Sequence, residues 1–290
     1  MTPTYITTEN LNHFIDLALA EDIGSGDHTT LAVIPEEAEN EAELKIKAEG
    51  ILAGIEFAKF YWKKLDPSLS VEYFHKDGDR VSFGDVAFIV RGSARSILTG
   101  ERLLLNCMQR MSGIATKTKG ISDLLRGAKA KILDTRKTTP NFRMMEKWAV
   151  FIGGGKNHRF GLYDQILLKD NHIDMAGGIE KALKSTAEYL KLHNLDLKVE
   201  IETRSLHEVK QVIKEGSADI IMLDNMIPSV MKEAVALIDG KFITEASGGV
   251  TELNINEVAD AGIDYISVGA LTHSYESLDM SLKAVKHKII

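Results

Sequence analysis

From about residue 131 onward, short apolar runs alternate with amphipathic stretches. The apolar runs predict strands at 131–136, 165–170, 197–203, 219–225, 242–247 and 265–270. Between most of them, apolar residues recur at helical spacing, as at 177–193, 205–216 and 254–262. Strands that alternate with helices in this way are typical of parallel βα units. The alternation fits a barrel and a doubly wound sheet equally well.

The first part of the chain has a mixed pattern. It predicts helices near 8–21 and 55–65, and strands within 41–54, 70–81 and 86–92, which together fit a small α+β layer. From Ser93 a long helical pattern continues to about Lys119, and a second helix is expected at 120–127. We therefore expect an N-terminal α/β sandwich domain at 1–112, a second domain at 113–273, and a helix at 274–290 that packs back on the first domain.

The ends of the predicted strands favour a barrel. Each strand is apolar through its body and then changes character, at Arg136, Lys169, Glu202, Asp224, Ser247 and Gly269. The carboxyl ends of barrel strands are where such folds build their active sites. Side chains two apart on a strand share a face, so Asp134 should point with Arg136, Glu200 with Glu202, and Glu245 with Ser247. If that face is the interior, the mouth of the barrel is lined with charge.

Charge is distributed unevenly along the chain. The net charge is -7, yet residues 131–173 hold eight Lys or Arg against four Asp or Glu, a local net charge of +4. Such a local inversion indicates an anion-binding pocket. Guanidinium and ammonium groups that meet at one rim can hold a multiply charged anion. The candidates are Arg136, Lys137, His158, Arg159 and Lys169.

Other polar elements complete this candidate site. Glu202 and Asp224 suit Mg²⁺, directly or through water, or the hydroxyls of a ribose, although pairing with Lys169 or Arg136 alone would also explain them. The run GGGKNHR at 153–159 does not match the phosphate-loop motif and reads as a hinge. Small residues at 246–250 and 267–271, after the last two strands, are better candidates for binding phosphate.

Several classes of protein are disfavoured. The acidic balance argues against a general nucleic-acid binder. No apolar run is long enough to span a membrane, and the N-terminus lacks a signal-peptide pattern, so we expect a cytoplasmic protein. The single cysteine, Cys107, reads as a buried small hydrophobe, and no histidine pair has zinc spacing. The segment EDIGSGDHTT at 21–30 reads as a turn with a helix cap.

The combination of motifs resembles the quinolinate phosphoribosyltransferase family. The segments that carry the resemblance are EDIGSGDHTT, ERLLLNCMQRMSGIAT, LDTRKTTP, KWAVFIGGGKNHRFGLYDQILLKDNH, VEIET, IMLDN and EASGGV. They extend over nearly the whole chain. The resemblance implies an N-terminal α/β sandwich beside an incomplete, TIM-like α/β barrel, in a homodimer or higher oligomer whose subunits share active sites. The sequence departs from the family at Asn141 and Phe142, where Gly and Leu are usual, and at Trp148, where Tyr is usual.

The resemblance also implies a reaction and residue roles. Quinolinate and 5-phosphoribosyl 1-pyrophosphate (PRPP) would give nicotinate mononucleotide, pyrophosphate and CO₂, with Mg²⁺ as cofactor, in NAD biosynthesis. The quinolinate carboxylates would be bound by Thr135, Arg136, His158, Arg159 and Lys169, with Arg102 contributed by the partner subunit. The phosphoribosyl substrate would be held by Lys137, Glu202, Asp224 and the backbone of Ser247, Gly248, Gly249, Val268, Gly269 and Ala270. Catalytic roles would fall to Lys137, Lys169, Glu202 and Asp224, with Glu202 and Asp224 also holding the metal.

Three alternatives stay open from the sequence alone. One is a related enzyme of the same fold, such as a nicotinate phosphoribosyltransferase or the homologue associated with molybdenum transport. Another is a Schiff-base aldolase that uses Lys169, which also ends a strand. The third is a phosphate-sensing protein that binds its ligand without catalysis.

Overall fold

The computed structural model describes residues 2–125 and 127–285 and divides the chain into two compact units. Unit 1 combines the residues up to Lys119, Thr138–Gly154 and those from Leu271 on. Unit 2 comprises Gly120–Lys137 and Gly155–Ala270. Unit 1 extends past the expected boundary at 112/113 to Lys119, and two later segments of the chain also belong to it. In the sequence, all residues of unit 2 therefore lie between segments that belong to unit 1.

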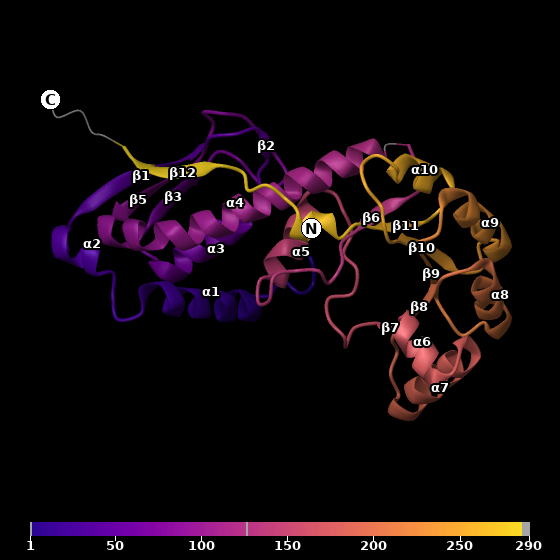
Figure 1. Cartoon of the computed structure of the whole chain (residues 1–290). Coiled ribbons are helices and arrows are strands. Elements are labelled where there is room, and N and C mark those ends of the chain that lie inside the picture. Colours follow the sequence, from indigo (N-terminus) through magenta and orange to yellow (C-terminus); the bar gives the residue numbers. More distant parts are fainter. Residues whose placement is uncertain (1, 126, 286–290) are drawn as a thin grey trace. The chain divides into compact units, whose positions relative to one another are not determined.

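Unit 1 is built on an antiparallel sheet whose strand order is β12-β1-β5-β3 (Figure 1). Its strands are β1 (Glu39–Ile46), β3 (Ser70–Tyr73), β5 (Val86–Ser93) and β12 (Met280–Ala284), and β2 (Gly50–Ile51) pairs separately with β4 (Arg80–Val81). Along β1, Ala42, Leu44 and Ile46 are buried while the residues between them are more exposed. This alternation is what a strand with one buried face requires.

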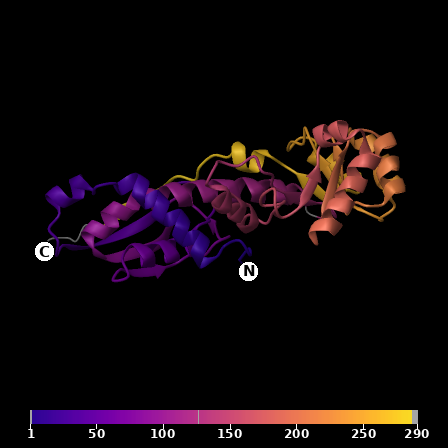
Figure 2. The same cartoon turned by 90° about the horizontal axis from the view of Figure 1, so that it is seen from below.

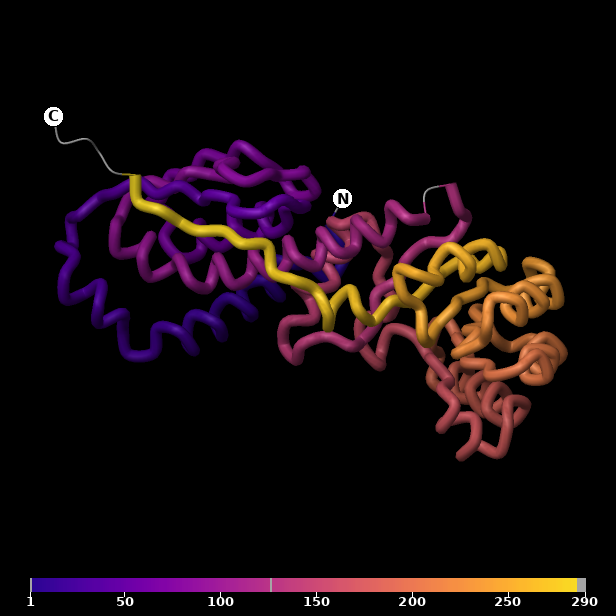
Figure 3. Tube along the Cα trace, turned by 45° about the horizontal axis from the view of Figure 1, so that its top comes forward, coloured from indigo at the N-terminus to yellow at the C-terminus, as the bar shows by residue number. Residues whose placement is uncertain are grey.

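The C-terminal helix expected at 274–290 is wrong over Met280–Ala284, which form strand β12. Met280 and Leu282 are buried and alternate with more exposed residues, so the segment has the period of a strand. It pairs antiparallel with β1, as the yellow end of the trace shows in Figure 3. The segment does return to the N-terminal layer, but as an edge strand. Residues 286–290 of the expected helix lie outside the described residues.

The helices of unit 1 mostly follow the sequence pattern. They are α1 (Thr8–Ile23), α2 (His28–Val33), α3 (Ile55–Leu65), α5 (Arg143–Ile152) and the part of α4 (Ala94–Leu124) up to Lys119, together with α11 (Ala270–His273) from Leu271 on. The capped turn expected at 21–30 is confirmed, since the Asp27 carboxylate accepts from the Thr30 N–H at the start of α2. The separate helix expected at 120–127 is wrong. Helix α4 continues through Gly120 because its buried face extends from Ile114 to Ile121.

Unit 2 is the incomplete, TIM-like barrel that the sequence predicted. Its six strands are all parallel, in the order β6-β11-β10-β9-β8-β7. They are β6 (Lys131–Leu133), β7 (Ile166–Leu168), β8 (Val199–Thr203), β9 (Ile220–Asp224), β10 (Ile243–Ser247) and β11 (Tyr265–Ser267). In the described part of the chain, the edge strands β6 and β7 do not pair with each other, so the sheet stays open.

Helices cover the outer face of this sheet (Figures 1 and 2). They are α6 (Asp170–Ala176), α7 (Ile179–His193), α8 (Leu206–Glu215), α9 (Pro228–Ile238) and α10 (Ile255–Asp260). Strand β8 is buried along its whole length, including Glu200 and Glu202, whose side chains share one face. Buried carboxylates need partners that compensate their charge. The face of β8 that carries Glu200 and Glu202 is therefore a candidate for the functional site. Among the described residues, no helix is both long and apolar enough to cross a membrane.

Candidate active site

The parallel strands of unit 2 bring most of the predicted site residues to one edge of the sheet. Asp134 to Lys137 follow β6, Lys169 follows β7, Glu202 lies near the end of β8, and Asp224 ends β9. Ser247 ends β10, and Val268 to Ala270 follow β11. Because parallel strands all run in one direction, these residues share the carboxyl edge. Arg102 is the exception, since it lies on the exposed side of α4 in unit 1.

A lysine and two carboxylates form the first part of the site. Lys169 Nζ lies 2.9 Å from Glu202 Oε1, and the Asp170 N–H donates to Glu202 Oε2 at 3.1 Å. Asp224, on the neighbouring strand, accepts from Asn225 Nδ2 at 2.8 Å. Burial raises the pKa of Asp224, and the negative charge of Glu202 adds to this effect. The three groups therefore interact electrically at adjacent strand ends.

This carboxylate pair fits Mg²⁺ by its chemistry. Glu202 and Asp224 offer the hard oxygen donors that Mg²⁺ takes in proteins, usually together with several water molecules. Both oxygens of Glu202 already accept hydrogen bonds from protein groups. Contact through water therefore suits Glu202 better than direct coordination.

Two arginines form the cationic part of the site. Arg159 is buried, with 9% of its surface exposed, and its Nη1 donates to the Gln165 carbonyl at 3.1 Å. Burial lowers the pKa of Arg159, and the nearby positive charge of Arg136 lowers it further. The Nε of Arg136 is buried and has no hydrogen-bond partner among the described residues. Two mutually repelling guanidinium groups and one unused donor are suited to an anion with more than one carboxylate or phosphate group.

The loop that carries Arg159 is fixed to the end of β6. Lys156 forms a parallel bridge with Leu133, so the segment runs briefly as an additional strand. Asp134, fully buried, accepts from Asn157 Nδ2 at 2.6 Å and from the His158 N–H at 2.9 Å. The glycines before this segment end helix α5, with Gly153 as its C-cap. A Cβ added at Gly153 would lie 2.5 Å from the Ala115 carbonyl oxygen, so the close packing against α4 requires glycine at this position.

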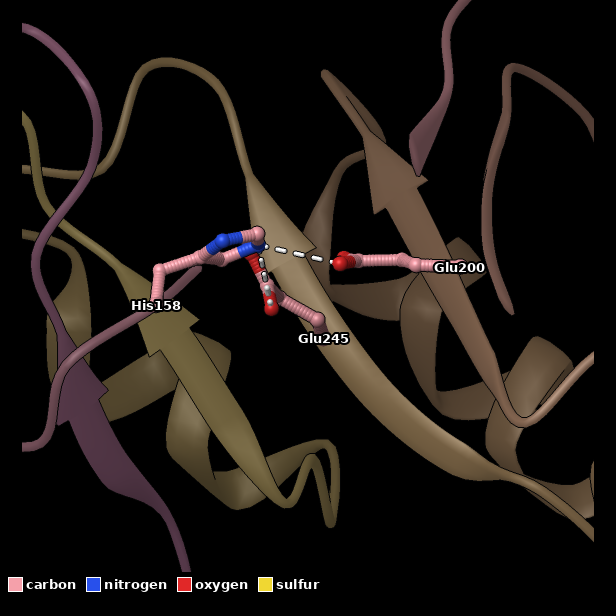
Figure 4. A group of neighbouring side chains, drawn as sticks. All are labelled: His158, Glu200 and Glu245. Carbon is pink, nitrogen blue, oxygen red and sulfur yellow. Dashed lines mark ion pairs between the residues drawn. The ribbon is translucent and has the colours of Figure 1, made fainter. Parts of the chain in front are cut away.

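The ring of His158 points at two buried carboxylates (Figure 4). Its Nε2 lies 3.0 Å from Glu200 Oε2 and 3.6 Å from Glu245 Oε2, and only 7% of the side chain is exposed. Burial raises the pKa of Glu200 to about 7. Burial also raises the pKa of Glu245 to about 8, with the charge of Glu200 as the next cause. One proton held within this pair relieves the repulsion between the carboxylates.

Sequence reasoning gave Glu200 and Glu245 no role, although it predicted that they share a face with Glu202 and Ser247. Both are buried, as expected for the inward face that they share with Glu202 and Ser247. The sequence feature that could have identified them is a glutamate inside a strand whose other residues are mostly apolar. Such a residue needs a partner, and the partner came from the loop at 156–159.

The small residues after β10 form a tight turn. Gly248 has φ +86°, and a Cβ added to it would lie 2.2 Å from Asn225 Oδ1. Gly249 has φ +62°, but a Cβ there would meet nothing within 4 Å. After β11, the Val268 N–H donates to the Leu133 carbonyl at 3.0 Å. After β6, the Lys137 N–H donates to Thr135 Oγ1 at 3.0 Å, and Lys137 is exposed. Hydrogen bonds thus fix the backbone after β6 and β11, whereas the turn after β10 depends on glycine at residue 248.

Two family models match consecutive parts of the chain. The quinolinate phosphoribosyl transferase N-terminal domain matches residues 27–112, and the C-terminal domain of the same family matches residues 114–283. The chain belongs to the quinolinate phosphoribosyltransferase family.

Individual relatives agree with this family assignment. A chloroplastic nicotinate-nucleotide pyrophosphorylase [carboxylating] of Arabidopsis thaliana is 49% identical over 296 residues, which cover 97% of this chain and 83% of that protein. A probable enzyme of the same name from Bacillus subtilis is 44% identical over 272 residues, covering 94% and 91%. The crystal structure of NadC from Streptococcus pyogenes superposes with a TM-score of 0.90 at 38% identity, covering 98% of this chain and all of that one.

The structure explains one departure from the quinolinate phosphoribosyltransferase pattern. Asn141, which stands where Gly is usual, has φ +63°. Asparagine is among the few residues that tolerate this left-handed conformation, so the loop keeps a backbone suited to glycine. Phe142, the changed residue that follows it, packs edge-on against Phe14. The loop is therefore accommodated within unit 1.

Proposed function

We propose that the protein transfers the phosphoribosyl group of PRPP to quinolinate and releases pyrophosphate and CO₂, giving nicotinate mononucleotide. The observation that carries this function is the pair formed by Arg136 and Arg159, with its unused Nε donor. A dicarboxylate offers enough negative charge to offset two guanidinium groups, whereas nicotinate has a single carboxylate. This charge balance favours quinolinate over nicotinate as the substrate.

In the first step, the pyridine nitrogen of quinolinate attacks C1 of the ribose as the bond to pyrophosphate breaks. Positive charge develops on the sugar, and Glu202 and Asp224 stabilise it from adjacent strand ends. Lys137 binds the departing pyrophosphate. Bound Mg²⁺, held by Glu202 and Asp224 through water, would neutralise further charge on that leaving group.

In the second step, the ring nitrogen has become cationic and withdraws electrons. The bond to the adjacent carboxylate breaks, its electron pair moves toward the ring, CO₂ leaves, and the ring carbon takes up a proton. Thr135, Arg136, Arg159 and Lys169 hold the dicarboxylate, and no side-chain nucleophile is required. His158 was also predicted to bind a carboxylate of quinolinate, but both of its ring nitrogens contact protein groups. The backbone of Ser247 to Gly249 and of Val268 to Ala270 binds the sugar phosphate.

The proposed enzyme is a homodimer in which Arg102 of the partner subunit completes each site. Support comes from the exposure of Arg102 on α4, where it is available to a second chain. A cytoplasmic location also remains a prediction, since plant relatives are named as chloroplastic or mitochondrial.

The deciding experiment supplies purified protein with PRPP, Mg²⁺ and either quinolinate or nicotinate. Nicotinate mononucleotide and CO₂ should form from quinolinate, and omission of Mg²⁺ with a chelator should strongly reduce the rate. Product from nicotinate alone would refute the proposal, and ligand binding without pyrophosphate release would favour a sensor. An aldolase is disfavoured, because Lys169 is ion-paired with Glu202 and a charged ammonium is not a nucleophile. Borohydride trapping of a carbonyl compound on Lys169 would restore that alternative.

A further inference from the structure

The His158 ring is held from both of its nitrogens. The backbone N–H of Arg159 donates to Nδ1 at 2.7 Å, so Nδ1 carries a lone pair. The proton of the neutral ring must therefore sit on Nε2, which faces Glu200 Oε2 at 3.0 Å. Glu245 Oε2 lies slightly farther from Nε2, at 3.6 Å. The contacts thus select one tautomer and one orientation of the ring.

The carboxylates are themselves fixed by neighbouring polar groups. Glu200 Oε2 also accepts from Gln165 Nε2 at 2.6 Å, and Glu245 Oε1 accepts from Ser267 on β11. The carbonyl of Gln165 in turn accepts from Arg159 Nη1. A closed ring of contacts therefore runs from His158 through Glu200 and Gln165 to Arg159, and back to His158.

These three side chains also have the spacing of a metal site. One ligand atom from each of His158, Glu200 and Glu245 lies within 4.8 Å of the others. A histidine that binds a metal usually donates a hydrogen bond from its other ring nitrogen. Here that nitrogen accepts one, so a metal on Nε2 would require a ring without any proton. The hydrogen-bond pattern thus favours a proton on Nε2 over a metal ion.

We infer that Glu200 is a positioning residue for substrate recognition: it holds the His158 ring, which anchors the backbone of Arg159, while Gln165 anchors the Arg159 guanidinium group. This inference rests on the proposed function, in which Arg159 binds a quinolinate carboxylate. The closed ring of contacts holds Arg159 at both ends of its side chain. It keeps the guanidinium beside Arg136 despite their repulsion. Loss of the ring should therefore weaken quinolinate binding while the PRPP contacts that follow β6, end β9 and follow β11, among them Lys137 and Asp224, stay in place.

The test compares Glu200→Met, which removes the acceptor, with Glu200→Gln, which retains a carbonyl oxygen for the Nε2–H. For Glu200→Met we expect the KM for quinolinate to rise tenfold or more, with little change in the KM for PRPP. Glu200→Gln should recover most of the loss. Asp264→Asn serves as a control, because that carboxylate bonds Thr244 at the opposite end of the sheet. Equal effects on both KM values, or no rescue by glutamine, would overturn the inference.

A second measurement does not depend on turnover. In protein labelled with ¹⁵N-histidine, the His158 resonances should show a protonated Nε2 and an unprotonated Nδ1 in the wild type. Glu245→Gln should keep this pattern, whereas Glu200→Met should lead to exchange between tautomers. A protonated Nδ1 in the wild type would overturn the inference, even if Glu200→Met does not fold. If the wild type shows the expected tautomer but neither binds nor converts quinolinate, the proposed function fails instead.

Discussion

Replacing Arg136 by methionine should stabilise the unliganded protein while weakening its binding of quinolinate. Methionine removes the buried Nε that has no partner and the charge that lowers the pKa of Arg159. A buried donor without a partner costs about 1–3 kcal/mol. Even the lower value should raise the midpoint of thermal unfolding by about 2 °C or more.

The loss of affinity follows from the same side chain. A hydrogen bond to a charged group contributes about 1.5–3 kcal/mol, and about 1.4 kcal/mol corresponds to a tenfold change in affinity. We therefore expect the Kd for quinolinate to increase roughly 10- to 100-fold in Arg136→Met. Calorimetric titration gives the Kd, and thermal unfolding without ligands gives the stability.

A matched control removes a positive charge at the opposite end of β6, the strand that Arg136 follows. Lys131 is exposed at the start of β6, so Lys131→Met should leave the Kd for quinolinate nearly unchanged. The reasoning is refuted if Arg136→Met is less stable than the wild type and binds quinolinate equally well. That result would mean that Arg136 serves the fold and not the ligand.

Three further predictions concern other parts of the protein. Gly248→Ala should lower the free energy of unfolding by about 1–3 kcal/mol, because the added Cβ would lie 2.2 Å from Asn225 Oδ1 at a left-handed backbone position. Gly249→Ala should lower it less, because a Cβ there would meet nothing within 4 Å. Thermal unfolding of the two variants tests this difference. Burial raises the pKa of Glu245 from 4.5 to about 8. Between pH 4.5 and about pH 8 the folded state therefore holds a proton that the unfolded state releases, and the contribution of Glu245 to stability should fall as the pH rises through this range. Glu245→Gln should flatten that part of the pH profile in denaturant titrations, and an unchanged slope would contradict the assignment. Arg102→Ala should be folded but inactive. If the subunits share active sites, mixing this variant with Lys169→Ala should restore part of the activity, and no recovery would argue against shared sites.

The barrel was predictable because local pattern and global fold agree there. Apolar runs of strand length alternate with amphipathic helices, and the polar residue that ends each run marks the carboxyl edge. The same reasoning found Lys169, Glu202 and Asp224, which lie on adjacent strands and interact with one another. Each of these residues was identified from its own strand alone.

The direction of a loop side chain was not predictable in this way. His158 and Arg159 are neighbours in a segment with many cations. Nothing in the local sequence indicates that the His158 ring turns toward buried carboxylates. That choice depends on Glu200 and Glu245, which come from two strands much later in the chain. The strand at Met280–Ala284 was missed for a related reason, since its partner β1 lies near the other end of the sequence.

The pairing of β12 with β1 has a consequence for synthesis on the ribosome. Strand β1 emerges early, but the strand that covers its edge becomes available only after all of unit 2 has been translated. During that interval the nascent chain carries an uncovered strand edge, which is a site for mispairing with other chains. A chain that ends before residue 280 would lack β12 and leave the β1 edge of the N-terminal sheet open to aggregation.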